Sequence, residues 1–481
     1  MSAATRTANL AQVVKPSRAI PILLSLFVFS LVLDNGFKFM SPALAESLSL
    51  PVNTVSLQAT LAGVLIGIGA VVYAALADTI PIRKLIIFAI VVMTVGSLVG
   101  FIFQGSFWLI LVGRLIQSAG LAAAETLYVI YVTKHFKGDE QKKYLGFSTA
   151  AFQLSLLIGA VGSGFIATYI GWAAFFLVAL LSLLAIPVVL RTVPEETTGA
   201  GHVDVFGLFL IAVFATGVIL FMQAFNPWYL LPIAAGLALF IWHIRAHDNA
   251  VITGAFFRNA QYSLMLLVVF VIYSVQLGYT FVFPFLVSDL YGYNLGEVSL
   301  LLVPGYIAAV IVGSATGKIA RFLTSKQAIT LALIVIILSL LVPALVVEKW
   351  IGIFVISMVL FGMGFALMYG PLLSTAILRV PVQNSGIAIG FYNLTINIAV
   401  PVGIAYTATL VQLKPQLIDG IVGSGQASVY GSVLLILAGV SALGLVLYRA
   451  SVVVLERKGT EMNTPVEHQS ADESASAPGT P

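Results

Sequence analysis

Long apolar stretches separated by short polar segments are the dominant pattern of this chain. A membrane-spanning helix needs about 20 mostly apolar residues, and on that basis the sequence predicts fourteen spans. The predicted spans lie near residues 19–46, 53–76, 85–104, 107–133, 145–169, 171–190, 205–224, 228–245, 261–288, 297–317, 327–347, 351–375, 384–412 and 428–449. We therefore expect an all-α polytopic membrane protein.

The positively charged residues are distributed unevenly between the two sides of these spans. With the N-terminus inside, the cytoplasmic segments hold all but four of the 23 Lys and Arg residues. Lys349 and Lys414 fall outside, and Lys38 and Arg114 lie within spans. Because cytoplasmic loops of membrane proteins carry an excess of Lys and Arg, the sequence predicts that both termini are cytoplasmic.

Two similar segments indicate an internal repeat. "YAALADTIPIRK" (73–84) follows the second span and "GSATGKIARFLTSK" (313–326) follows the tenth, and in each a helix end of small residues precedes a cationic turn. Parallel repeats are a common carrier architecture, so the sequence predicts two six-helix bundles in pseudo-twofold repeat plus two inserted helices. The predicted domains are a cytoplasmic N-terminus (1–18), an N-terminal bundle (19–191), a linker with two extra helices (192–257), a C-terminal bundle (258–450) and a disordered cytoplasmic tail (451–481).

Composition narrows the function. Hydrophobic residues make up 60% of the chain and charged residues 9%, whereas a soluble domain is about 25% charged. The chain has no cysteine, which excludes disulfides and thiolate chemistry. HExxH, GxSxG and phosphate-cradling motifs do not occur in the sequence. We therefore expect neither an enzyme nor an ATP-driven pump, with no cofactor, no metal site and no nucleic-acid partner.

Four charged residues lie inside apolar stretches: Asp34, Lys38, Arg114 and Glu125. A charge at bilayer depth costs at least about 2.5–3.5 kcal/mol on insertion scales, so such residues usually face a bundle interior or a wet cavity. An acid–base set of this kind is what a proton-coupled carrier needs. We assign Asp34, Glu125 and Arg114 as proton-coupling candidates.

The fourth span carries its polar residues on one face. Arg114 and Glu125 are eleven residues apart, about three helical turns and about 16 Å along the axis, and Gln117 lies one turn after Arg114. Because this span runs inward, Arg114 is expected in its outer half and Glu125 in its inner half. The competing interpretation is an interhelical ion pair that only fixes packing.

Asp34 lies near the middle of the first span and can meet Lys38 one turn on or Arg114 across the cavity. A neighbouring cation favours the ionised carboxylate, whereas burial disfavours it, and a carrier can exploit that competition. The alternative is a permanent Asp34–Lys38 salt bridge that takes no part in transport. Lys38 could also bind an anionic group of a substrate.

Polar residues in the spans of the second half are the remaining candidates. Their competing role is interhelical hydrogen bonding. The substrate-binding candidates are Lys38, Gln117, Tyr273, Gln276, Tyr279, Tyr369, Asn393 and Asn397.

Two motifs carry a family resemblance. Asp78 followed by Arg83 and Lys84 comes after the second span, and Arg114-x-x-Gln117 lies in the fourth. These segments resemble signatures of the major facilitator superfamily, although Ala74 stands where glycine is usual. The resemblance covers about residues 19–450. It implies that Asp78, Arg83 and Lys84 form a gating latch on the inner side.

Residues 204–220 resemble the first inserted helix of the fourteen-span branch of drug:proton antiporters in this superfamily. Gly159, Gly162 and Gly164 resemble the glycine-proline signature of these antiporters, but Ala160 stands at the proline position. The sequence thus favours a secondary active transporter, expected to be monomeric, in the inner or plasma membrane of a bacterium.

Its expected function is proton-coupled efflux of a hydrophobic or amphipathic small molecule by alternating access, with protons, the small-molecule substrate and the lipid bilayer as partners. One alternative is a proton-coupled importer or organic-anion carrier, favoured by Lys38, Arg114 and Ala160. A third hypothesis is a membrane receptor on a carrier fold without transport, because a fold alone does not fix function.

Overall fold

The computed structural model of the chain describes seven segments. They are residues 16–77, 79–194, 204–246, 259–319, 321–380, 385–422 and 424–457. Within these segments all regular secondary structure is helical, which confirms the predicted all-α class. Most of the predicted N-terminal segment and tail, and parts of the predicted linker, lie outside the described residues.

The first half of the chain forms the helices of six predicted spans. In chain order these are η1 (Pro16–Arg18), α2 (Ile20–Phe39), α3 (Ser41–Leu48), α4 (Val52–Leu76), α5 (Ile82–Ile102), α6 (Phe107–His135), α7 (Gly138–Tyr169), α8 (Ala174–Val178), η2 (Ala179–Ala185) and α9 (Ile186–Thr192). The first span is split at Met40, and a 3-10 segment divides the sixth span.

The inserted helices and the second half follow. They are α10 (Val205–Ala224), η3 (Pro227–Tyr229), α11 (Leu230–Ala246), α13 (Ala260–Tyr291), α14 (Leu295–Ile319), α15 (Ser325–Ala344), α16 (Gly352–Ile377), α17 (Ser385–Leu413) and α18 (Gln426–Arg457).

Twelve helices in the described part of the chain are long and apolar enough to cross a membrane. Two shorter apolar stretches, Leu154–Tyr169 within α7 and Phe209–Ala224 within α10, lie where the fifth and seventh spans are predicted. The chain is therefore a polytopic helical membrane protein.

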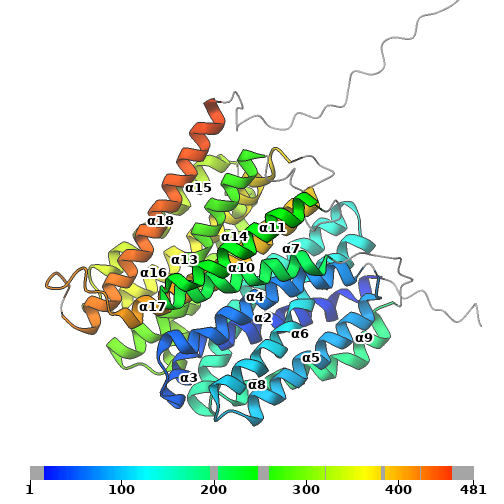
Figure 1. Cartoon of the computed structure of the whole chain (residues 1–481), viewed down its shortest axis with the longest axis horizontal. Coiled ribbons are helices and arrows are strands. Elements are labelled where there is room, and N and C mark those ends of the chain that lie inside the picture. The colour runs from blue at the N-terminus through cyan, green and yellow to red at the C-terminus, as the bar shows by residue number, and fades with distance from the viewer. Residues whose placement is uncertain are drawn as a thin grey trace, which may run out of the picture.

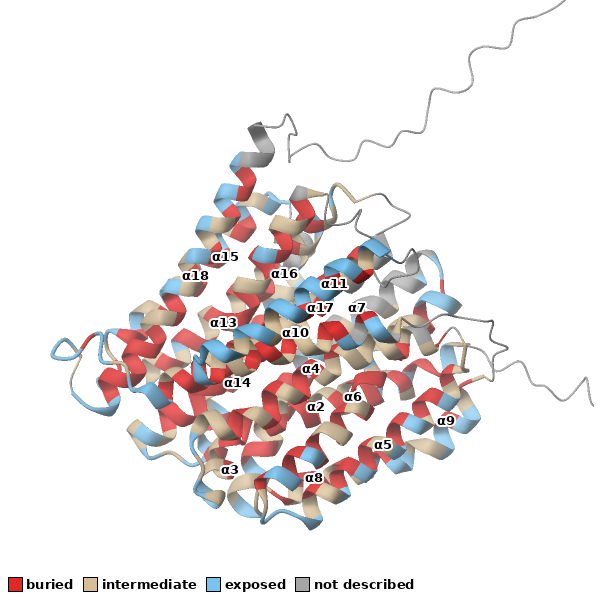
Figure 2. Ribbon diagram, viewed as in Figure 1, coloured by how far each residue is buried: buried red, intermediate tan, exposed pale blue. Residues whose placement is uncertain are grey.

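The helices of the two halves meet at one end of the molecule and diverge toward the other. Figure 1 shows the blue and cyan helices of the first half and the yellow and orange helices of the second half spreading apart from the end that holds α3. Near the meeting point the Gly296 amide at the start of α14 donates to Thr168 Oγ1 at the end of α7, at 2.9 Å. Figure 2 shows buried residues concentrated where the halves face each other, with exposed residues on outer helices such as α11.

Small residues bring the helices close together. A Cβ on Gly113 of α6 would lie 2.8 Å from the Gly96 carbonyl oxygen of α5, and one on Gly403 of α17 would overlap the backbone of Ser274 on α13. Such glycines allow backbone-to-backbone contact between membrane helices. The close α5–α6 contact positions α6, the helix that carries Arg114 and Glu125, against α5.

The inserted helix α10 lies against both halves of the molecule. It packs on α4 of the first half and α17 of the second. Gln223 Nε2 donates to Ser56 Oγ at 3.1 Å, and the Gln223 carbonyl oxygen accepts from Thr409 Oγ1 at 2.9 Å. The insert is thus part of the packed structure and joins the two halves at its Gln223 end.

Candidate functional site

Asp34 and Lys38 form an ion pair one turn apart on α2. Asp34 Oδ2 accepts from Lys38 Nζ. The Asp34 and Lys38 side chains are 6% and 12% exposed, respectively, so the pair is held almost completely inside the protein. Burial makes such a pair costly unless further contacts complete it.

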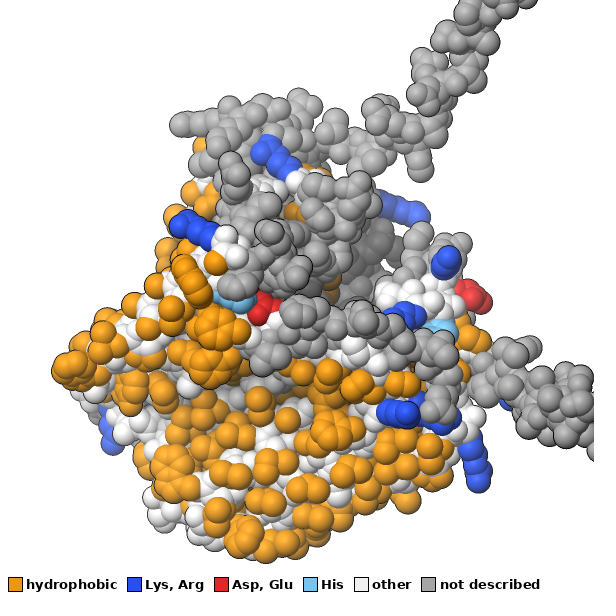
Figure 3. All heavy atoms as spheres, turned by 45° about the vertical axis from the view of Figure 1, so that its right-hand side comes forward, with side chains coloured by type: hydrophobic (Ala, Val, Ile, Leu, Met, Phe, Trp, Pro, Cys, Tyr) orange, Lys and Arg blue, Asp and Glu red, His pale blue; other side chains and the backbone are white. Residues whose placement is uncertain are grey.

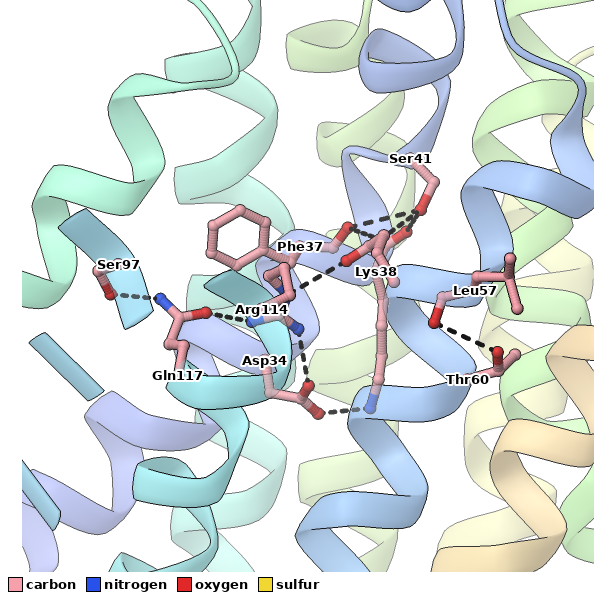
Figure 4. A network of polar contacts seen from close by, with 10 residues as sticks. Asp34, Phe37, Lys38, Ser41, Leu57, Thr60, Ser97, Arg114 and Gln117 are labelled. Atoms are coloured by element: carbon pink, nitrogen blue, oxygen red, sulfur yellow. Dashed lines mark hydrogen bonds and ion pairs between the residues drawn. The ribbon is translucent and has the colours of Figure 1, made fainter. Parts of the chain in front are cut away.

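Arg114 on α6 completes this pair from the opposite side. Its Nη2 donates to Asp34 Oδ1 at 3.3 Å, and its guanidinium carbon lies 4.2 Å from the centre of the Phe37 ring. The Arg114 side chain is fully buried. Figure 4 shows Asp34 between Arg114 and Lys38. The sequence left open which cation Asp34 meets, and the structure shows that it meets both.

Two neutral amides accept hydrogen bonds from Nε and Nη1 of Arg114. Nε donates to Gln58 Oε1 at 3.2 Å, and Nη1 donates to Gln117 Oε1. Gln117 Nε2 in turn donates to Ser97 Oγ at 2.7 Å. A guanidinium presents its donors in a fixed planar fork, so these contacts set the position of Arg114 relative to Asp34.

Gln58 is a site residue that the sequence analysis did not identify. It is 1% exposed, and its Nε2 donates to the Phe37 carbonyl oxygen at 2.9 Å and to Ser41 Oγ at 3.1 Å. Gln58 therefore connects α4 to the split between α2 and α3 while it holds Arg114. The available signal was a glutamine inside the apolar run of the second span.

Two adjoining pockets lie between the halves beside this network. The first has about 340 Å³ of empty space and reaches Lys38 and Asn35, and the second has about 500 Å³ and reaches Gln276. Leu156, Leu277, Thr280 and Tyr306 line both pockets. The residues lining only one of them are Asn35, Lys38, Phe39, Ala160, Phe281, Ile404, Gln276, Leu302, Gly305, Ala309, Met358, Phe361, Gly362 and Phe365. A mostly apolar lining with a few polar groups is typical of a small-molecule site.

Glu125 lies apart from the Asp34 network. It is exposed, in contrast to Arg114 on the same helix. It interacts electrostatically with Tyr369 on α16 of the other half, and Tyr369 is 41% exposed. The structure therefore brings two of the predicted residues together at a second place between the halves.

The remaining predicted substrate-binding residues fall into different environments. Tyr279 is buried, and its hydroxyl is 2.7 Å from Ser357 Oγ, a contact between α13 and α16. Asn397 packs against Gly67 of α4, and Asn393 is exposed. Tyr273 is buried, with its ring 5.8 Å from that of Phe365 in the second pocket.

The predicted latch is described only in part. Asp78 lies outside the described residues. Arg83 and Lys84 lie in the first turn of α5, where Arg83 is half-buried and Lys84 is exposed.

The helical fold thus holds a buried ionic network within its first half and two pockets lined by residues of both halves. A family profile of the Major Facilitator Superfamily matches residues 22–404. The chain belongs to this superfamily.

Similar proteins include several named for transport or resistance. Multidrug resistance protein Stp of Mycobacterium tuberculosis is 24% identical over 345 residues, which cover 69% of this chain and 64% of Stp. The match thus spans less than two thirds of the length of Stp. Quinolone resistance protein NorB of Staphylococcus aureus is 22% identical over 406 residues, covering 81% of this chain and 87% of NorB. Riboflavin transporter RibZ of Clostridioides difficile is 19% identical over 393 residues, covering 80% of this chain and 86% of RibZ.

Solved structures share the fold. The nucleoside transporter NupG matches with a TM-score of 0.64 and 15% identity, covering 90% of this chain and 98% of NupG. A bacterial homologue of the human lysosomal transporter Spinster matches with a TM-score of 0.68 and 11% identity, covering 93% of this chain and 99% of the other.

Family and neighbours are membrane transporters and not enzymes. The chain is a multi-pass helical member of this superfamily, and its bacterial relatives assign it to the bacterial cell membrane.

Proposed function

We propose that this transporter exports a hydrophobic or amphipathic small molecule by alternating access, driven by proton entry. The observation that carries the proposal is the buried Asp34 carboxylate, which contacts two cations beside an apolar pocket between the halves. Relatives named for multidrug and quinolone resistance support export.

Asp34 is the proposed proton carrier. Its carboxylate is buried and contacts both Lys38 and Arg114, so a proton would compete with these two cations for the same oxygens. Movement of α6 relative to α2 changes the Arg114–Asp34 distance. The carboxylate then accepts or releases a proton as the carrier changes state, and Glu125 relays protons in the inner half.

The proposed topology has fourteen spans with both termini cytoplasmic, and the domain boundaries are those predicted from the sequence. The two shorter apolar stretches in α7 and α10 support the additional spans. In Figure 3 most of the visible Lys and Arg side chains lie toward the upper and right-hand edges, away from a broad hydrophobic surface. In the proposed topology the diverging end of the helices faces the cytoplasm. Arg83 and Lys84 at the start of α5 are proposed to act as a gating latch together with Asp78, which lies outside the described residues.

One observation favours a second candidate function. Lys38 and Arg114 together exceed the single charge of Asp34, and Lys38 reaches the pocket. An organic anion entering with a proton would balance this excess. The second candidate is therefore a proton-coupled importer or organic-anion carrier.

Transport in proteoliposomes separates the two candidates. The purified protein is reconstituted, a pH gradient of either direction is imposed, and accumulation is followed for lipophilic cations, neutral compounds and organic anions. If the protein is an exporter, substrate should move in the direction opposite to the protons. Movement of an anion together with protons would favour the second candidate, and no gradient-dependent movement of any compound would contradict both.

A further inference from the structure

We propose that Glu125 and three tyrosines of the second half form a binding site for the cationic end of an amphipathic substrate. The tyrosines are Tyr273 on α13, Tyr369 on α16 and Tyr392 on α17. The inference rests on the proposed function for the ligand being transported cargo, but it does not depend on proton coupling.

Glu125 faces the other half of the molecule and not the lipid. Eleven residues after Arg114, it lies about 20° from the same face of α6, because each residue turns the helix by about 100°. Val112, which is 47% exposed on the outer surface, lies about 140° away from Glu125 around the helix. The electrostatic interaction of Glu125 with Tyr369 agrees with this direction.

Among the described residues, the Glu125 carboxylate takes part in no ion pair. The ion pairs among described residues are Asp34 with Lys38, Asp34 with Arg114, and Asp204 with His243. A lone carboxylate within a membrane span is costly to retain. Asp34 has two cationic partners, whereas Glu125 has none among the described residues. A cation on the cargo would supply the partner that Glu125 lacks.

The tyrosines extend from Glu125 into the second half. Electrostatic interactions connect Glu125 to Tyr369, Tyr369 to Tyr392, and Tyr392 to Tyr273. In the described part of the chain, the buried hydroxyls of Tyr273 and Tyr392 have no hydrogen-bond partner of normal geometry. The two hydroxyls lie next to each other, and because buried hydroxyls are normally satisfied, their remaining hydrogen-bonding capacity can serve a ligand.

The site adjoins the apolar pocket through one aromatic contact. Phe365 lines the 500 Å³ pocket, and its ring packs edge-on against Tyr273 at 5.8 Å between centroids. An amphipathic molecule can therefore place its apolar body in the pocket and its charged end toward Glu125. Aromatic faces attract cations, and a carboxylate attracts a cation and repels an anion. The geometry selects lipophilic amines and quaternary cations.

The test uses ions of matched shape and opposite charge. The full chain in nanodiscs, without a pH gradient, is titrated with tetraphenylphosphonium, tetraphenylborate and neutral triphenylphosphine oxide. The wild type is expected to bind the phosphonium more tightly than the borate. Glu125→Gln should weaken phosphonium binding about tenfold or more and leave the neutral compound unchanged. Tyr369→Leu should weaken phosphonium binding about fivefold through loss of the ring.

Two further variants serve as controls. Glu46→Gln, at an exposed carboxylate on α3, should bind all three compounds as the wild type does. Glu125→Asp keeps the charge and should retain most of the phosphonium affinity, which distinguishes loss of charge from loss of folding.

Wild-type phosphonium affinity in Glu125→Gln, or wild-type binding of the borate at least as tight as that of the phosphonium, would overturn the assignment. The protein could also bind the phosphonium through Glu125 and yet exchange no protons. That result would support the binding site and contradict the proposal of proton coupling.

Discussion

Replacing Arg114 by lysine tests whether the planar fork of the guanidinium is needed, because charge is kept while the fork is lost. In the structure this side chain donates to three different groups, Asp34, Gln58 and Gln117. A single ammonium on a shorter stem can reach Asp34 but cannot hold both amides in the same geometry. Arg114→Lys should therefore keep the ion pair and release the two amides.

The magnitude follows from these two lost hydrogen bonds. Interhelical hydrogen bonds in membranes are worth about 0.6 kcal/mol on average, and a buried group left unsatisfied costs about 1–3 kcal/mol. The expected loss of stability is then about 1–4 kcal/mol for Arg114→Lys. Arg114→Ala also removes one partner of a buried ion pair, for which about 3–5 kcal/mol is typical, although Lys38 remains to limit the loss.

The assay combines thermal unfolding in nanodiscs, followed by the fluorescence of the five tryptophans, with pH-driven transport in proteoliposomes. Both variants should unfold at lower temperature than the wild type, alanine more than lysine, and transport should fall about tenfold or more, which corresponds to about 1.4 kcal/mol. Arg321→Lys, at an exposed position after α14, is the matched control. Wild-type stability and transport in both Arg114 variants would refute the reasoning.

Three further predictions concern topology, packing and the amide contact. Single cysteines placed in this cysteine-free chain at Ser49, Gly292 and Ser424 should label from outside and those at Gly138 and Ser325 only from inside; external labelling at Gly138 would contradict the topology. Gly403→Ala should lower the melting temperature because its methyl group meets the Ser274 backbone, and overpacking typically costs about 1–3 kcal/mol. Gly439→Ala, with open space around it, should leave the melting temperature unchanged. Equal melting temperatures of the two variants would show that the close α13–α17 contact at Gly403 does not stabilise the fold. Gln58→Leu should reduce pH-driven transport more than Gln416→Leu at an exposed loop position, and unimpaired transport would show that Gln58 only fills space.

The helical fold could be predicted because membrane spans leave a simple signal in one sequence. Twenty apolar residues in succession have few other folded solutions, and each predicted span corresponds to a helix or a run of short helices. The break of the first span at Met40 and the 3-10 segment Ala179–Ala185 were not predicted, because both depend on local packing.

The charged residues of the candidate site could be predicted from the sequence, but the neutral residues that contact them could not. Asp34, Lys38 and Arg114 stand out because a charge in an apolar run is rare. Gln58 does not stand out, since a neutral amide in a span is common enough to be a packing contact. Tyr279 shows the reverse case, because a polar residue in a span is equally compatible with a ligand site and with the interhelical hydrogen bond to Ser357 that the structure contains. Helix spacing alone does not say which neighbouring helix a side chain faces.

Proton counting in Asp34→Asn tests the central claim most directly. Asparagine keeps the shape and part of the hydrogen bonding but cannot titrate. The measurement is the number of protons exchanged per substrate in proteoliposomes, with tetraphenylphosphonium as probe and a pH-sensitive dye inside. The account predicts that the variant loses pH-driven accumulation and proton exchange while it still equilibrates the probe down its own gradient. Full pH-driven transport with an unchanged proton count in Asp34→Asn would contradict it.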